Sequence, residues 1–170
     1  MKQVKTLLLA TVLFIGTQFA TAQTKVGHIN VQDLMTANPA MKAAEAQLKK
    51  LQDTYDAEYK KMVQEYQTKL AQYQQDAEAK TVTDAVNETR SQEMQDMGAR
   101  IQKYQDTASK DLQQKSIELQ KPIMEKAQAA IQKVARAKGI QYVLDSTTGS
   151  GVLLADGTDL LVDVKKELGY

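Results

Sequence analysis

The side chains that could perform covalent chemistry are few and do not cluster. A serine nucleophile needs a histidine to activate it, and a metal site needs several ligands close together. The chain has one histidine, His28, and no cysteine. We interpret His28 as a residue on the face of a strand, and neither a Gly-rich phosphate loop nor a group of metal ligands accompanies it. We therefore predict no catalytic residue, no metal, no cofactor and no enzymatic activity.

Tyrosine and methionine offer a different chemistry, that of adaptable apolar contacts. They recur at helical spacing in the middle of the chain, where a rigid coiled coil would place leucine. Aromatic rings with a polar group and flexible thioethers can contact many apolar sequences, but they can also simply pack two helices together. Both roles can coexist. The candidate binding residues are Tyr55, Tyr59, Met62, Tyr66, Tyr73, Met94, Met97 and Tyr104.

Two long helices are expected to position these side chains. Asn38-Pro39 begins the first helix as a cap followed by proline, and its apolar stripe runs from Met41 to Ala77. The stripe breaks at 80–84, where Thr81 or Thr83 can cap a second helix that ends at Gly139. We predict an antiparallel hairpin over 39–138, an arm of about 60 Å per 40 residues. One uninterrupted helix through 81–84 is the alternative.

Pro122 lies inside the second apolar stripe. An interior proline removes one backbone hydrogen bond and collides with the carbonyl four residues earlier, which predicts a kink near Glu118. The kink could be a fixed bend or a pivot. The position of the turn at 81–83 also predicts that Leu51 faces Leu112 across the hairpin.

The first 22 residues have the pattern of a secretory signal. Lys2 and Lys5 precede an uncharged apolar run that is too short to span a bilayer, and Ala20-Thr21-Ala22 matches a signal-peptidase site. We predict cleavage after Ala22 and export. A buried N-terminal helix is the alternative. Loss of the two lysines changes the net charge from +1 to −1, and such near-neutrality argues against nucleic acid as a partner.

Short elements flank the predicted arm, at 23–38 and 139–170. Strands are expected at 25–31, 141–145 and 152–154, followed by a terminal helix that Thr158 or Asp159 caps and Gly169 ends. Three short strands and one short helix bury too little apolar surface to be stable alone, so we predict an oligomer held together through this body. Its oligomerisation residues would be Val26, Ile29, Val31, Tyr142, Val143, Leu144, Val152 and Leu154.

The two ends also carry a resemblance to a known family. One half of it is V-x-x-I-N-V-x-x-L-M, formed by Val26, Ile29, Asn30, Val31, Leu34 and Met35. The other half is the G-I-Q-Y-V-L-D strand over 139–145 and the ending formed by Asp159, Leu160, Leu161, Val164 and Leu168. In this order, across the whole mature chain, these motifs resemble the OmpH/Skp family of periplasmic chaperones.

The resemblance implies a mainly α fold in which a coiled-coil hairpin arm is attached to a short-stranded, barrel-like β body shared by a homotrimer. It also implies a periplasmic holdase that binds unfolded outer-membrane proteins between its arms without ATP. The family is markedly basic, whereas this chain is balanced in charge. This difference leaves electrostatic capture of clients, and contact with lipopolysaccharide or a membrane surface, open.

The competing interpretation is a structural protein of the periplasm, either a coiled-coil spacer or an efflux adaptor. Efflux adaptors carry further barrel domains around their hairpin, and 139–170 leaves no room for them. A spacer does not need tyrosine and methionine along its seam, but the sequence is compatible with one.

Overall fold

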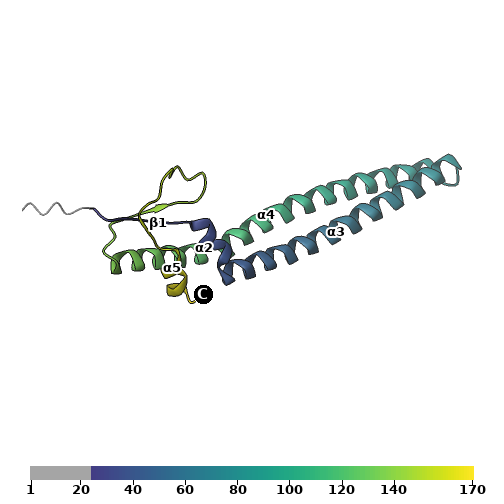
Figure 1. Cartoon of the computed structure of the whole chain (residues 1–170). Helices are drawn as coiled ribbons and strands as arrows, with labels where there is room; N and C mark the ends of the chain where they lie inside the picture. The colour runs from purple at the N-terminus through teal and green to yellow at the C-terminus, as the bar shows by residue number, and fades with distance from the viewer. Residues whose placement is uncertain (1–23) are drawn as a thin grey trace, which may run out of the picture.

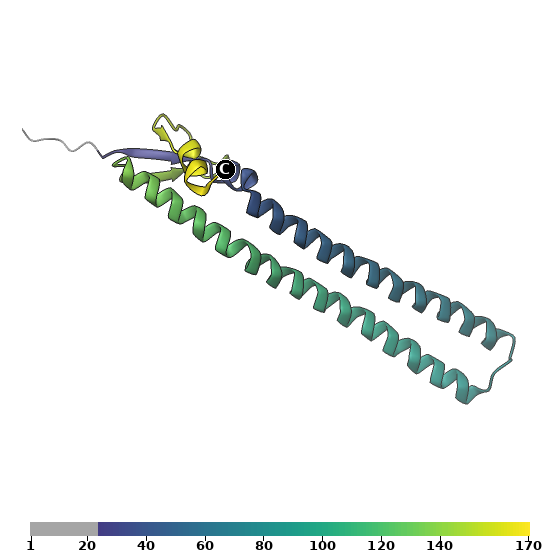
Figure 2. The same ribbon diagram turned by 90° about the horizontal axis from the view of Figure 1, so that it is seen from below.

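The structure, a computed structural model, describes residues 24–170, so the predicted signal peptide lies outside the described residues. Two long helices dominate it: α3 (Pro39–Glu78) and α4 (Asp84–Ala137). They run side by side and antiparallel, and together they form an arm that projects from a small body (Figures 1 and 2). The predicted hairpin is confirmed, and an uninterrupted helix through 81–84 is not what forms.

The predicted helix ends are confirmed in position and mechanism. Asn38 caps α3, since its side-chain oxygen accepts a hydrogen bond of 2.9 Å from the Ala40 amide, and Pro39 follows as the first helical residue. Thr83 caps α4 through the Val86 amide at 3.4 Å. Gly139 follows α4 with φ of +68°, a conformation that favours glycine. Between these ends α4 continues through Pro122 as one helix.

The body contains a small parallel sheet in the order β2-β1-β3. Strand β1 (Val26–Ile29) is central, with Val26 opposite Tyr142 of β2 (Tyr142–Asp145) and Gly27 opposite Thr158 of β3 (Thr158–Asp159). A side chain at Gly27 would lie 3.0 Å from both the Ile140 side chain and the Thr158 carbonyl oxygen. Glycine therefore allows β1 to lie close to both neighbours.

The first predicted strand is shorter than expected, and Val31 is not part of it. Val31 begins a short helix, α2 (Val31–Ala37), that was not predicted. The Asn30 side chain accepts a hydrogen bond from the Asp33 amide at 3.0 Å, and this cap starts the helix where the alternating pattern stops. Leu34 then points into the core with no exposed surface.

The third predicted strand, 152–154, is wrong. These residues have no strand partner in the described chain, and Leu153 is completely exposed. Thr158 and Asp159 occupy the place beside β1 instead, because Gly157 lets the backbones meet: a Cβ there would lie 2.8 Å from the Val26 carbonyl oxygen. The terminal helix α5 (Leu161–Leu168) begins after Leu160, one residue beyond the predicted cap Asp159 and two beyond the alternative, Thr158. The Asp159 carboxylate still accepts a hydrogen bond from the Leu161 amide at 2.9 Å.

The hydrophobic core lies where the sheet, α2 and α5 pack on the last turns of α4. Its largest fully buried side chains are Ile29, Leu34, Leu160 and Val164. Small residues of α4, from Ala127 to Ala135, complete it. Helix α4 therefore forms one half of the arm and also the surface on which the other elements of the body pack. No helix within residues 24–170 is both long enough and apolar enough to cross a membrane.

Candidate functional site

The seam between α3 and α4 contains all the tyrosines and methionines predicted to bind. Met94 and Met97 are buried there, together with Met41, Ala44 and Ala108. The other predicted residues are half-buried: Tyr55, Tyr59, Met62, Tyr66, Tyr73 and Tyr104. Packing between the helices thus accounts for the two buried methionines, whereas each half-buried side chain keeps part of its surface exposed.

Tyr55 shows how one seam tyrosine can pack between the helices and still keep part of its surface exposed. Its ring meets the ring of Tyr104 edge-on, with centroids 5.8 Å apart, and its hydroxyl donates to the Asp111 carboxylate at 2.7 Å. The hydrogen bond to Asp111, with a smaller effect of burial, raises the pKa of Tyr55. This contact next to Leu112 agrees with the predicted register of the hairpin.

Nearer the tip, charged side chains cross the seam. Glu93 accepts from the Lys69 ammonium at 2.5 Å and from the Tyr73 hydroxyl at 2.6 Å. The Arg90 guanidinium lies 4.3 Å from the centre of the Tyr73 ring and 3.0 Å from the Asp76 carboxylate. We call these five residues the tip network. Single-helix patterns could not reveal it, because each partner is on the other helix.

The tip network shifts the protonation equilibria of its members. The hydrogen bond from Lys69, followed by that from Tyr73, lowers the pKa of Glu93. The same bonds raise the pKa of Lys69 and of Tyr73, since each favours the protonated donor. The charged forms of Lys69 and Glu93 are therefore stabilised together.

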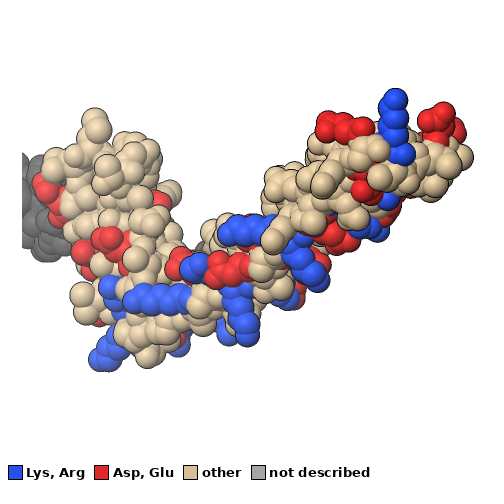
Figure 3. All heavy atoms as spheres, turned by 90° about the vertical axis from the view of Figure 1, so that its right-hand side faces the viewer, with Lys and Arg blue, Asp and Glu red and all other residues tan. Residues whose placement is uncertain are grey.

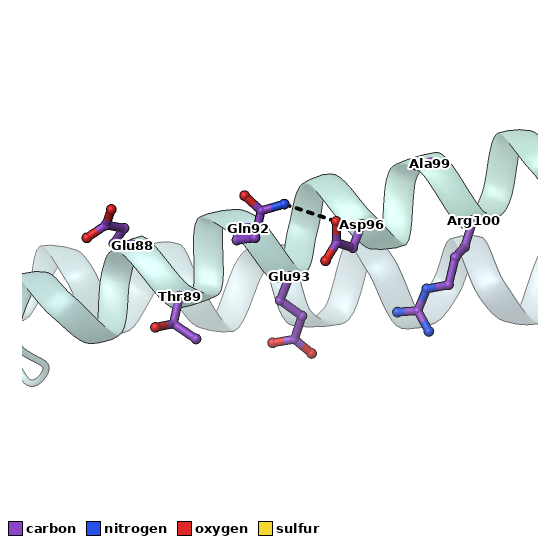
Figure 4. A pocket seen from close by; sticks show the side chains of 7 residues that line it. All are labelled: Glu88, Thr89, Gln92, Glu93, Asp96, Ala99 and Arg100. Carbon is purple, nitrogen blue, oxygen red and sulfur yellow. Dashed lines mark hydrogen bonds between the residues drawn. The ribbon is translucent and has the colours of Figure 1, made fainter.

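A wide, shallow hollow of about 1010 Å³ lies beside this network on α4 (Figure 4). Gln92 donates to Asp96 at 3.0 Å along its rim, and Glu88, Glu93 and Arg100 contribute charges of both signs. Figure 3 shows acidic and basic side chains interspersed along the visible face of the arm. Neither the hollow nor that face presents the concentrated single charge that binds nucleic acid.

A second hollow, at the base of the arm, is mainly apolar. We call it the arm-root groove; it has a volume of about 530 Å³ and lies between α2 and α4. Ile117 and Met124 lie in it with 53% and 57% of their surfaces exposed. Neither residue was among the predicted ones because both lie off the main stripe, although their spacing of seven residues places them on one face of the helix. The other lining residues are Val31, Met35, Gln120, Lys121, Glu125, Ala127, Gln128 and Ile131.

The predicted oligomerisation residues divide into three groups by their burial. Ile29 is buried in the core, and Val31 and Val143 pack against it, so these three stabilise the single chain. Val152 is half-buried. The others face outward with large exposed fractions, and two further residues that were not predicted join them. We call this set the body apolar surface: Val26, Tyr142, Leu144, Leu153, Leu154 and Val162.

His28 has a polar partner that the sequence did not indicate. Its Nδ1 lies 3.2 Å from the Ser146 hydroxyl, in a half-buried position between β1 and the end of β2. The neighbouring Asp145 carboxylate accepts instead from Thr147 and from the Val31 amide, so it does not orient the imidazole. In residues 24–170 no group of three or more acidic or histidine side chains is placed to hold a metal ion.

Comparison with known proteins gives a consistent result. The OmpH family, described as outer membrane proteins (OmpH-like), matches residues 25–168. A crystal structure of a candidate outer membrane chaperone (OmpH-like) from Caulobacter crescentus CB15 has a similar fold, with a TM-score of 0.74 and 19% identity over 86% of this chain and 85% of that one. No curated protein matches the sequence.

Proposed function

This chain belongs to the OmpH-like family, and we propose that it is an ATP-independent holdase chaperone of the periplasm that binds unfolded outer-membrane proteins and prevents their aggregation. The observation that supports this most directly is an elongated arm whose apolar side chains remain accessible along the seam and at the root. An arm that served only as a spacer would bury them. The sequence has no phosphate-binding loop that would couple binding to a nucleotide.

The arm-root groove is the part of this surface best suited to a client. An unfolded outer-membrane strand alternates apolar and polar side chains, so it can place apolar groups in the groove while its polar groups meet water, Lys121 and Glu125. Burial of apolar area contributes about 25 cal/mol per Å², so one side chain in this groove gives weak binding. Several such contacts along the arm add up, and methionine adapts to different sequences.

The half-buried seam tyrosines extend this client face toward the tip. Tyr59 and Tyr66 are the strongest candidates, since both are half-buried and neither hydroxyl has a hydrogen-bond partner within residues 24–170. Met94 and Met97 are buried between the helices, so they pack behind this face and do not contact a client directly. The charges along the arm are balanced, so client binding should weaken only modestly with salt.

A direct test replaces the two exposed groove residues. The double variant Ile117→Ser, Met124→Ser should lose most of its ability to prevent aggregation of an unfolded outer-membrane β-barrel protein, measured by light scattering. A matched double variant, Gln95→Ser with Gln102→Ser, alters two exposed residues of the same helix at the same spacing and should protect as the unaltered protein does. If the unaltered protein gives no protection, the structural spacer is the better interpretation.

We also propose that the functional unit is a homotrimer held together by the body apolar surface. This surface has large apolar side chains beside two sheet edges, β2 and β3, that have no further strand partner in the described chain. Exposed apolar groups next to free edges favour association. A trimer would let three arms enclose one client.

The assembly proposal has its own test. Leu154→Asp places a charge at a site that is 75% exposed in the single chain, so the fold of that chain should persist. Burial of this charge between subunits is unfavourable, and the trimer should dissociate. Native mass spectrometry at micromolar concentration measures the change. A trimer that survives the substitution, or an unaltered protein that is monomeric, would refute the proposed interface.

A further inference from the structure

The end of α2 contains a carbonyl that its own helix cannot satisfy. The Leu34 oxygen would ordinarily accept from the amide four residues later, that of Asn38. That amide instead donates to the Met35 oxygen at 3.1 Å, which closes the last turn more tightly. Leu34 has no exposed surface, so water does not reach this residue. A buried carbonyl without a partner is destabilising.

Tyr170 satisfies this carbonyl from the far end of the sequence. Its hydroxyl donates to the Leu34 oxygen at 2.9 Å. Gly169, with φ of +87°, turns the chain after α5, and the Tyr170 amide donates to the Lys165 oxygen at 3.0 Å, which fixes the residue on α5. Figures 1 and 2 both show the end of the chain beside α2, where α3 begins. Burial, opposed by a hydrogen bond with Asn38, raises the pKa of Tyr170, so the hydroxyl remains a donor at neutral pH.

The same place, where arm and body meet, is incompletely packed. A cavity of about 340 Å³ lies there between the elbow at Asn38-Pro39, Pro122 of α4 and Tyr170. Pro39 and Pro122 have no backbone amide hydrogen to donate, so neither can make a backbone hydrogen bond across this space. The space between the two prolines is also not filled by close packing. Apart from apolar packing, two directional bonds hold the elbow: the Asn38 cap on α3 and the Tyr170 bond on α2.

We propose that Tyr170 is a latch that sets the angle between arm and body. With its hydroxyl in place, α5 holds the end of α2 and so fixes the point from which α3 departs. Without it, the Leu34 carbonyl must find another partner, and the elbow can move into the adjacent cavity. This inference concerns how the arm is held and does not depend on client binding.

The absence of cysteine makes the latch measurable with introduced labels. Spin labels at Thr81→Cys, in the turn at the arm tip, and at Thr148→Cys, in the body beyond β2, report the arm-to-body distance. Labelled chains are mixed with an excess of unlabelled ones, so that only distances within one chain are observed. We expect one narrow distance distribution for the unaltered protein and a broader or divided one for Tyr170→Phe, which removes only the hydroxyl.

Hydrogen exchange supplies the second measurement. Tyr170→Phe should speed exchange roughly tenfold in the segment 34–42, the change expected when one buried hydrogen bond is lost. Exchange in β1 and in α4 beyond Pro122 should not change. Tyr59→Phe removes a hydroxyl from a half-buried tyrosine of the arm and should alter neither measurement.

Each result decides the proposal. A broader distance distribution with faster exchange confined to 34–42 supports the latch. An unchanged distribution overturns it, whatever the exchange shows. Faster exchange throughout the sheet and α5 also overturns it, because Tyr170 would then be an ordinary packing residue of the body. Tyr170→Phe keeps the aromatic ring, so the fold should persist. Circular dichroism at the same temperature checks this.

Discussion

The body and the arm distribute their apolar side chains in opposite ways. In the body, four large side chains are completely buried (Ile29, Leu34, Leu160 and Val164), while another set, including Leu153 and Leu154, faces outward. In the arm, few apolar side chains are fully buried and most of the seam is half-buried, while the exposed Ile117 and Met124 lie in the arm-root groove. The body thus has a dry interior and a separate apolar exterior, whereas the arm has a half-buried seam and one apolar groove at its root.

The difference indicates which interactions each region can support. A dry aliphatic core fixes one arrangement, and a separate apolar exterior suits a permanent partner. A half-buried seam, crossed by hydrogen-bonded pairs such as Tyr55–Asp111 and Lys69–Glu93, keeps the helices together while apolar surface stays accessible. These properties are consistent with a body that assembles and an arm that binds many sequences.

The largest effect should come from the body core. Leu160 has no exposed surface, so Leu160→Ala should lower the free energy of unfolding by about 3 kcal/mol through lost burial and the cavity left behind. Urea titration followed by circular dichroism, at one fixed protein concentration, measures this. The concentration must be constant because assembly would add to stability. A loss no greater than that of the arm variant described next would contradict the contrast between the regions.

The matching substitution in the arm should have a smaller effect. Leu112 is half-buried in the seam, so Leu112→Ala removes less apolar surface from the interior and leaves a site that water can enter. We expect a loss of about 1 kcal/mol in the same titration. A loss as large as that of Leu160→Ala would mean that the seam is drier than it is in the single chain, as it would be if another subunit covered it.

The arm was predictable from the sequence, and much of the body was not. Asn38-Pro39, Thr83 and Gly139 act on their own helix ends, so local signals were sufficient to place them. Val31 was misassigned because a valine after an alternating segment fits a strand and a short helix equally well. The failure at 152–154 has another cause: these residues are apolar enough for a strand, but the place beside β1 goes to Thr158, which Gly157 brings within reach.

In the candidate site, too, some features follow from local sequence patterns and others do not. The positions of Tyr55 and Met97 in the seam follow from helical periodicity, which the sequence contains. The partners Asp111, Glu93 and Asp76 depend on how two helices are aligned, and Tyr170 meets Leu34 only because α5 folds back on α2. Contacts between distant segments require the register of the whole fold, and no local pattern encodes that register.

The smallest predicted effect depends on pH and separates the tip of the arm from its root. Bonds to Lys69 and Tyr73 lower the pKa of Glu93 below its ordinary value of 4.5. A carboxyl whose pKa is lower in the folded state stabilises that state above its unfolded pKa, and this contribution is lost as the pH falls through the folded value. Glu93→Gln should therefore lower the melting temperature at pH 7, and the difference from the unaltered protein should be smaller at pH 3 than at pH 7.

A control at the other end of the arm makes this test specific. Glu45 is exposed on α3 near the body, and it has no hydrogen bond or ion pair among residues 24–170. Glu45→Gln should therefore leave nearly the same small difference in melting temperature at both pH values. If Glu93→Gln behaves in the same way as Glu45→Gln, the tip network does not stabilise the hairpin. The tip would then be held by apolar contacts of the seam alone, and its polar contacts would add nothing measurable to the stability of the hairpin.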